Sequence, residues 1–116
     1  MERVVCQINN TVVTCIDEPG QGGACHEYSI HGMQKPMDRL GSINFQNGPI
    51  QEYGVNGIQN EDLLAIVIDR LQGFQSGKFA CRDNAIALTK CEEALLWLRK
   101  RTSDRQQRGV EGRSVV

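Results

Sequence analysis

Residues 81 to about 108 have the pattern of a single helix, and this long helix constrains the fold more than any other segment of the chain. Its core-type positions recur at spacings of three and four residues, as in a heptad repeat, and we call the eight residues at these positions the seam. One line of the seam holds Cys81, Leu88, Leu95 and Thr102, and the other holds Asn84, Cys91, Leu98 and Arg105. The pattern predicts a rigid helix that packs against another element along the seam.

Two members of the seam, Asn84 and Arg105, are strongly polar, and a polar group in a buried stripe needs a partner. They are 21 residues apart in the sequence, which corresponds to roughly 31 Å along a straight helix. One ligand of nucleotide size therefore cannot contact both within a single subunit. Either the two residues serve different sites, or an assembly brings the end of one subunit to the tip of another; we favour two sites.

Three arginines, Arg101, Arg105 and Arg108, share one face at the end of this helix because they are spaced i, i+4, i+7. Residues 99–113 carry a local net charge of +4, whereas the rest of the chain carries −5. The row is either a solvated, partly frayed helix end or a set of guanidinium groups that bind phosphates. The limited charge fits a few phosphates and argues against duplex nucleic acid as the partner.

Phe74 and Asn84 also allow two interpretations each. Phe74 is either a core residue or a platform on which a base stacks. Asn84 is either a satisfied core amide or a group that reads the edge of a base. In the second interpretation both residues would belong to a ligand site held by rigid helical positions.

The chain predicts an α+β fold, in which an N-terminal small antiparallel β-sheet is followed by an antiparallel helical hairpin with a long C-terminal helix. Strands are expected at residues 4–8 and 11–16, joined by an Asn9-Asn10 turn, at 25–30, and in a second hairpin of 42–45 with 49–55. A first helix begins at the N-cap Asn60 and ends before Ser76-Gly77-Lys78. Its apolar face is formed by Leu64, Val67, Ile68 and Leu71.

With 116 residues the chain is long enough for one domain, 1–116, which we divide into a sheet portion (1–56), a helical hairpin (57–112) and a tail (113–116). Ile86, Leu96 and Trp97 project from the long helix away from the seam. If the small sheet does not cover them, they predict self-association.

No pattern in the sequence indicates catalysis, a cofactor, a metal or a membrane. The five cysteines form no CxxC pair and are typical of reduced, buried thiols of a cytosolic protein. Cys25 and His26 are adjacent on an expected strand and would point to opposite faces, so with Cys15 and His31 they predict no tetrahedral metal site. The glycine-rich segments lack the spacing of a phosphate-binding loop, and no leader or membrane-spanning stretch is present.

Several motifs resemble the phage anti-Thoeris family called Thoeris anti-defence one, and the hairpin also resembles that of phage anti-CBASS cyclic-nucleotide sponges. The motifs are Gly54-Val55-Asn56-Gly57, Glu61-Asp62-Leu63-Leu64, Asp69-Arg70-Leu71, Phe74-Gln75-Ser76-Gly77, Phe79-Ala80-Cys81-Arg82-Asp83-Asn84 and Arg108-Gly109-Val110-Glu111-Gly112. The resemblance covers residues 54–112 well. The segments from Pro19-Gly20 to Tyr28 and Phe45-Gln46-Asn47-Gly48-Pro49 resemble the anti-Thoeris branch specifically.

The resemblance implies a non-enzymatic sponge that binds a cyclic ADP-ribose isomer in the cytoplasm of the infected bacterial host, so that the immune effector never meets its signal. It also implies a homo-oligomer, a hexamer built as a trimer of dimers, and a separate site for cyclic di- or trinucleotides. Phe74 and Asn84 would belong to the cyclic ADP-ribose pocket, which a partner loop containing Asn47 would complete. Arg70 is a further candidate ligand-binding residue.

Arg101, Arg105 and Arg108 would meet phosphates, and the separation along the helix assigns them to the second site. The sequence departs from the family pattern at its end, where Gly112-Arg113-Ser114 replaces the usual Gly-Thr. Two rival functions remain: an enzyme that cleaves the cyclic nucleotide, and a nucleic-acid-binding or purely oligomeric phage module.

Overall fold

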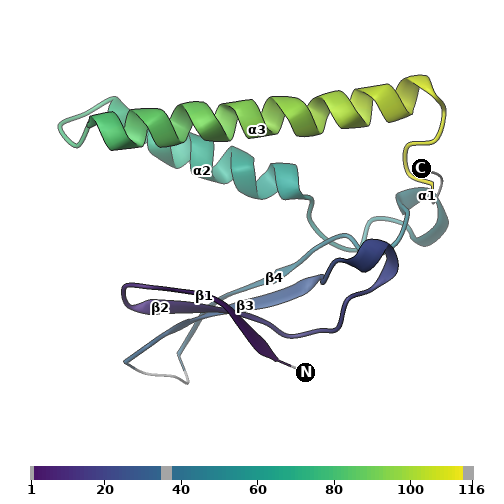
Figure 1. The fold of residues 1–116 in the computed structure, drawn as a ribbon, viewed down its shortest axis with the longest axis horizontal. Coiled ribbons are helices and arrows are strands. Elements are labelled where there is room, and N and C mark those ends of the chain that lie inside the picture. Colours follow the sequence, from purple (N-terminus) through teal and green to yellow (C-terminus); the bar gives the residue numbers. More distant parts are fainter. Residues whose placement is uncertain (1, 35–37, 114–116) are drawn as a thin grey trace. The chain divides into compact units, whose positions relative to one another are not determined.

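The computed structural model describes residues 2–34 and 38–113, and the last residues of the expected tail, 114–116, lie outside this range. The chain forms two compact units, Met1–Ile58 and Gln59–Val116 (Figure 1). The first unit contains the β-sheet and the second contains the two long helices. The α+β prediction is confirmed.

The described part of the first unit contains a four-stranded antiparallel sheet whose strands follow one another in chain order. Its elements are β1 (Arg3–Ile8), β2 (Thr11–Cys15), the short turn η1 (Gln21–Gly23), β3 (Glu27–Gly32), β4 (Arg39–Asn44) and α1 (Ile50–Tyr53). The first hairpin is as expected, because Ile8 pairs with Thr11 and Asn9 has a φ of 49° in the intervening turn. β3 begins at Glu27, so Cys25 and His26 precede the strand instead of lying in it.

The expected second hairpin, 42–45 with 49–55, is wrong. β4 pairs with β3, and the segment after Pro49 forms the short helix α1. Proline has no N–H for a sheet ladder, and its extended backbone is suited to precede a first helical turn, which explains why this segment is not a strand.

The loop around α1 is closed by two side-chain amides. The Gln46 amide donates to the carbonyls of Gly48 (3.1 Å) and Gly54 (2.8 Å). The Asn56 side chain accepts from the Asn47 N–H and donates to the Asn47 carbonyl, both at 2.8 Å. The loop is thus held by hydrogen bonds at both ends, which presents the exposed Asn47 on a fixed backbone.

The second unit is a helical hairpin of α2 (Asn60–Gln75) and α3 (Arg82–Gln107), which lie side by side in Figure 1. The first cap differs from the expectation: Gln59 precedes the helix, and its N–H donates to the Asp62 carboxylate at 2.8 Å, so Asn60 is already helical. At the start of α3 the Cys81 sulfur accepts from the Asn84 N–H.

The seam prediction agrees with the burial along α3. Six of its members, from Asn84 to Thr102, are half-buried and Arg105 is buried, whereas Cys81 at the cap is exposed. Three residues of the predicted apolar face of α2, Leu64, Ile68 and Leu71, are half-buried, but the fourth, Val67, is exposed. In the described chain, no helix combines the length and apolar character that crossing a membrane requires.

Candidate functional site

Two phenylalanines meet at the tip of the helical hairpin. Phe74 near the end of α2 and Phe79 in the connection contact each other edge to face, with ring centroids 6.4 Å apart. The Arg70 guanidinium lies 5.6 Å from the centre of the Phe74 ring, and the Lys78 ammonium lies 5.7 Å from that of Phe79. We call these four residues the tip cluster, and it combines exposed aromatic surface with two positive charges.

Asn84 lies in the first turn of α3, at the same end of the hairpin as the tip cluster. A hydrogen bond from the Cys81 N–H to the Gln75 side chain (3.0 Å) ties the start of α3 to the end of α2. The Asn84 side chain is half-buried, and within residues 2–34 and 38–113 its amide has no hydrogen-bond partner. It therefore keeps its donor and acceptor available for a ligand.

A groove runs along the C-terminal half of α3, and we call it the arginine groove. It has a volume of about 300 Å³. Its lining residues are Trp97, Lys100, Arg101, Asp104, Arg105 and Arg108. Trp97 is 70% exposed, and Lys100 forms an ion pair with Asp104 at 2.8 Å. The groove thus places an exposed indole beside several guanidinium groups, which suits a ligand with a base and phosphates.

Arg105 differs from the other arginines of the groove because its side chain is buried. Its Nη2 donates to the carbonyls of Val110 (2.8 Å) and Arg113 (3.0 Å), and its Nε contacts the Glu111 carboxylate at 3.3 Å. The partner that the seam pattern required for Arg105 is therefore the turn that follows α3. Arg105 fixes this turn against the end of the helix.

The structure groups most of the residues chosen from the sequence. Phe74 and Arg70 are in contact, and Arg101, Arg105 and Arg108 line one groove. Asn47 belongs to the other unit. The sequence did not predict a ligand site at Lys78 and Phe79 of the tip cluster, or at Lys100 and Trp97 of the groove. Trp97 precedes Arg101 by one helical turn, a spacing that could have linked the two residues.

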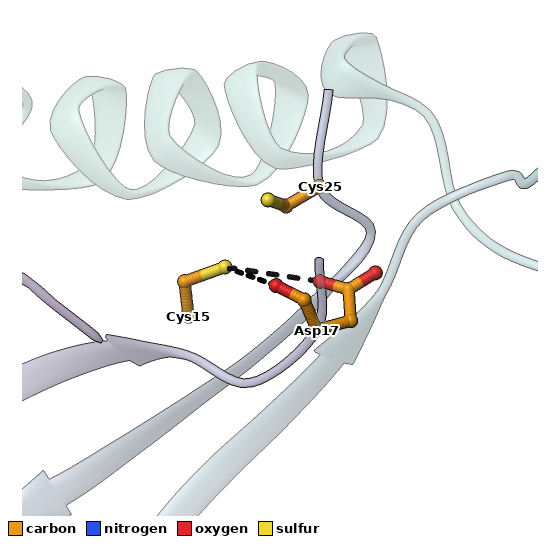
Figure 2. A group of neighbouring side chains, drawn as sticks. All are labelled: Cys15, Asp17 and Cys25. Atoms are coloured by element: carbon orange, nitrogen blue, oxygen red, sulfur yellow. Dashed lines mark hydrogen bonds between the residues drawn. The ribbon is translucent and has the colours of Figure 1, made fainter. Parts of the chain in front are cut away.

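A third group of polar side chains lies at the end of β2, where Cys15 and Cys25 are buried and Asp17 is half-buried. Sulfur atoms of Cys15 and Cys25 and a carboxylate oxygen of Asp17 all lie within 4.8 Å of one another (Figure 2). Burial raises the pKa of the Cys15 thiol, and its interaction with the neighbouring Cys25 sulfur adds to this effect. Burial would also raise the pKa of Asp17, but hydrogen bonds from the backbone of Glu27 and His26 outweigh it, so its pKa is lowered.

Comparison with known proteins decides the family of this chain. The sequence model of the Acb2/Tad1 hairpin domain matches residues 37–103, more than half of the chain. The chain belongs to the Acb2/Tad1 hairpin family. The matched segment, residues 37–103, contains the whole tip cluster, Asn84 and Arg101, whereas Arg105 and Arg108 lie beyond its end.

A relative named Thoeris anti-defense 1, from Bacillus phage SBSphiJ7, is 53% identical over 93 residues. The alignment covers 80% of this chain and 63% of the relative, so the chain spans less than two thirds of that protein's length. The relative's name marks it as a phage anti-defence protein. The resemblance inferred from the sequence motifs is confirmed at the level of the family.

Proposed function

We propose that this protein is a phage anti-defence sponge that binds a cyclic ADP-ribose isomer without cleaving it and so blocks Thoeris signalling in the cytoplasm of the infected host. The observation that carries the proposal is the tip cluster with the unpartnered Asn84 amide at the same end of the hairpin. A cyclic ADP-ribose presents an adenine face, polar base edges and a pyrophosphate, which correspond to an aromatic platform, an amide and cations, respectively.

The tip cluster is well suited to bind tightly because little of it needs to be ordered on binding. Phe74 and Phe79 already contact each other, and the Gln75–Cys81 hydrogen bond fixes the connection between the helices. A sponge acts stoichiometrically and must compete with the immune effector, which requires nanomolar affinity, about −12 kcal/mol. Preorganised side chains on rigid helices lower the entropic cost of reaching that affinity.

We further propose the arginine groove as a second site, for cyclic di- or trinucleotides of CBASS-type signalling. Arg101 is exposed in the groove and Trp97 offers a stacking surface, which supports contacts to phosphate and base. Arg108 would be a further phosphate contact. Arg105 also lines the groove, but its guanidinium binds the turn at 110–113, so its effect on a ligand would come mainly through that turn.

Assembly would complete both sites. The half-buried seam and the exposed Trp97, Leu96 and Ile86 leave the hairpin with apolar surface that a second copy would cover, in keeping with a hexamer built from dimers. Asn47, held on its closed loop, would reach the tip cluster of a partner subunit.

The decisive experiment mixes the protein with a cyclic ADP-ribose isomer, denatures the complex, and analyses the released ligand by mass spectrometry. Recovery of intact ligand at one equivalent per pocket supports a sponge, and recovery of cleaved product would instead establish the rival enzyme. Native mass spectrometry with cyclic ADP-ribose isomers and cyclic oligonucleotides would count subunits and ligands together. Binding to duplex or single-stranded DNA with a steep salt dependence, without any cyclic nucleotide binding, would favour the nucleic-acid-binding module.

A further inference from the structure

The first unit has an unusual core, since all the buried side chains among its described residues are polar or contain sulfur. Among its described residues the buried ones are Cys15, Cys25, His26 and Ser29, and Cys15 is completely inaccessible to solvent. Large apolar side chains such as Val4, Ile8 and Leu40 are exposed instead. A unit of this size with so little apolar burial ordinarily needs a further stabilising element, such as a disulfide or a structural metal.

The donor atoms of this core converge. Cys15 ends β2, Asp17 lies in the segment that follows, and Cys25 comes after η1, yet their sulfur and carboxylate atoms meet within 4.8 Å (Figure 2). Ligand atoms around a tetrahedral zinc ion lie roughly 3.3–3.8 Å apart, given zinc–sulfur bonds of about 2.3 Å and zinc–nitrogen bonds of about 2.0 Å. Small side-chain adjustments would therefore bring the three residues to bonding distance.

His26 supplies an independent sign of a ligand. Its side chain is nine-tenths buried, and its Nδ1 has no hydrogen-bond partner within the described parts of the chain. The same nitrogen lies 3.6 Å from Asp17 Oδ2, so His26 borders the group of Cys15, Asp17 and Cys25 through the Asp17 carboxylate. A buried ring nitrogen without a partner is costly, and coordination of a metal would remove that cost.

A strand at residues 25–30 would place Cys25 and His26 on opposite faces of the sheet. Because β3 begins only at Glu27, that restriction does not apply to them. The hydrogen bonds from the His26 and Glu27 N–H groups to Asp17 instead fold this segment back toward the end of β2. The backbone thereby brings Cys25 and His26 close to Asp17.

We propose that Cys15, Cys25 and His26 Nδ1 bind a structural divalent cation of the zinc type, with the Asp17 carboxylate as the fourth ligand. On binding, the cation displaces the thiol protons of Cys15 and Cys25 to solvent, and no oxidation occurs. Two thiolates and one carboxylate around a doubly charged cation leave a net charge of −1. The Arg3 guanidinium, which interacts with Cys25 and Cys15, balances that charge.

The inference is independent of the proposed sponge function, and its test does not use cyclic nucleotides. The full-length protein is purified without chelators, and bound metals are measured by elemental mass spectrometry. We expect one zinc per chain, retained in the control Cys6→Ser, whose thiol is exposed, and lost in Cys15→Ser and Cys25→Ser. His26→Asn should weaken zinc binding by at least about tenfold.

A second measurement uses only the wild-type protein, so its result does not depend on whether the variants fold. The reduced wild-type protein is freed of metal and titrated with Co²⁺ while the near-ultraviolet and visible spectra are recorded. Thiolate-to-cobalt charge-transfer and tetrahedral ligand-field bands that saturate at one equivalent support the site. Absence of these bands, zinc content that Cys15→Ser does not change, or a Cys15–Cys25 disulfide in the freshly purified protein would overturn the proposal.

Discussion

Arg105 Nε lies 3.3 Å from Glu111 Oε1, so a buried arginine of the long helix is bound to the turn that follows it. Two further hydrogen bonds join the same guanidinium to the carbonyls of Val110 and Arg113. Arg105 is therefore both a member of the seam and the residue that closes the end of the hairpin unit.

Replacing Arg105 by alanine should destabilise the protein, because the carbonyls of Val110 and Arg113 lose a charged donor. We expect the free energy of unfolding to fall by about 1–3 kcal/mol in urea denaturation. Arg99→Ala is the matched control, since Arg99 is exposed on the same helix, and it should change the stability by less than about 0.5 kcal/mol. Equal stability of the two variants would refute the structural role of Arg105.

Phe74→Ala and Asn84→Ala should each abolish binding of cyclic ADP-ribose isomers while the oligomer stays intact. Phe74 is 41% exposed and its ring contacts lie within the tip cluster, and Asn84 has no side-chain partner in the described chain, so we expect the packing of α2 against α3 to survive both substitutions. Isothermal titration calorimetry and native mass spectrometry measure the two properties separately. Gln72→Ala, on the exposed surface of α2, serves as the control and should bind normally. If both site variants bind cyclic ADP-ribose with wild-type affinity, Phe74 and Asn84 do not belong to its pocket.

Arg101→Ala should weaken the binding of cyclic oligonucleotides by roughly 10- to 100-fold, the loss expected when one charged hydrogen-bond donor to a phosphate is removed. Its effect on cyclic ADP-ribose should be small, because the arginine groove and the tip lie at opposite ends of α3. Arg99→Ala removes the same charge outside the groove and should preserve binding of both ligands. If Arg101→Ala impairs only cyclic ADP-ribose binding, the two-site assignment is wrong.

Gly48→Ala should destabilise the loop that presents Asn47. Gly48 has a φ of +85°, and a Cβ there would lie 2.5 Å from the Tyr53 ring. The left-handed backbone alone costs about 1–2 kcal/mol, and the Tyr53 ring would also have to move. Gly73→Ala is the opposite case, a helical glycine with nothing within 4 Å, and should stabilise the protein by about 0.5–1 kcal/mol. Thermal unfolding of both variants measures the contrast, and a gain of stability in Gly48→Ala would contradict the observed backbone.

Local patterns in the sequence were sufficient to predict the helical hairpin and the first β-hairpin. The seam depends on the 3.6-residue period of a helix, and the Asn9-Asn10 turn depends on a residue that tolerates positive φ. The second hairpin was predicted wrongly because the strand-like composition at 49–55 hides the short helix α1, which begins directly after Pro49. β4 instead pairs with β3, across a connection that local patterning does not specify.

The sequence alone determined that Phe74, Asn84 and the three arginines stand on one helical hairpin, since their spacing on the helices is fixed by the chain. Only the tertiary structure decided what each side chain contacts. It turned Arg105 inward to the turn at 110–113, set Phe79 against Phe74, and gathered Cys15 and Asp17 with Cys25 and His26 from two separate segments. Periodicity specifies the face of an element on which a residue lies, whereas contacts between loops and segments depend on how the whole chain packs.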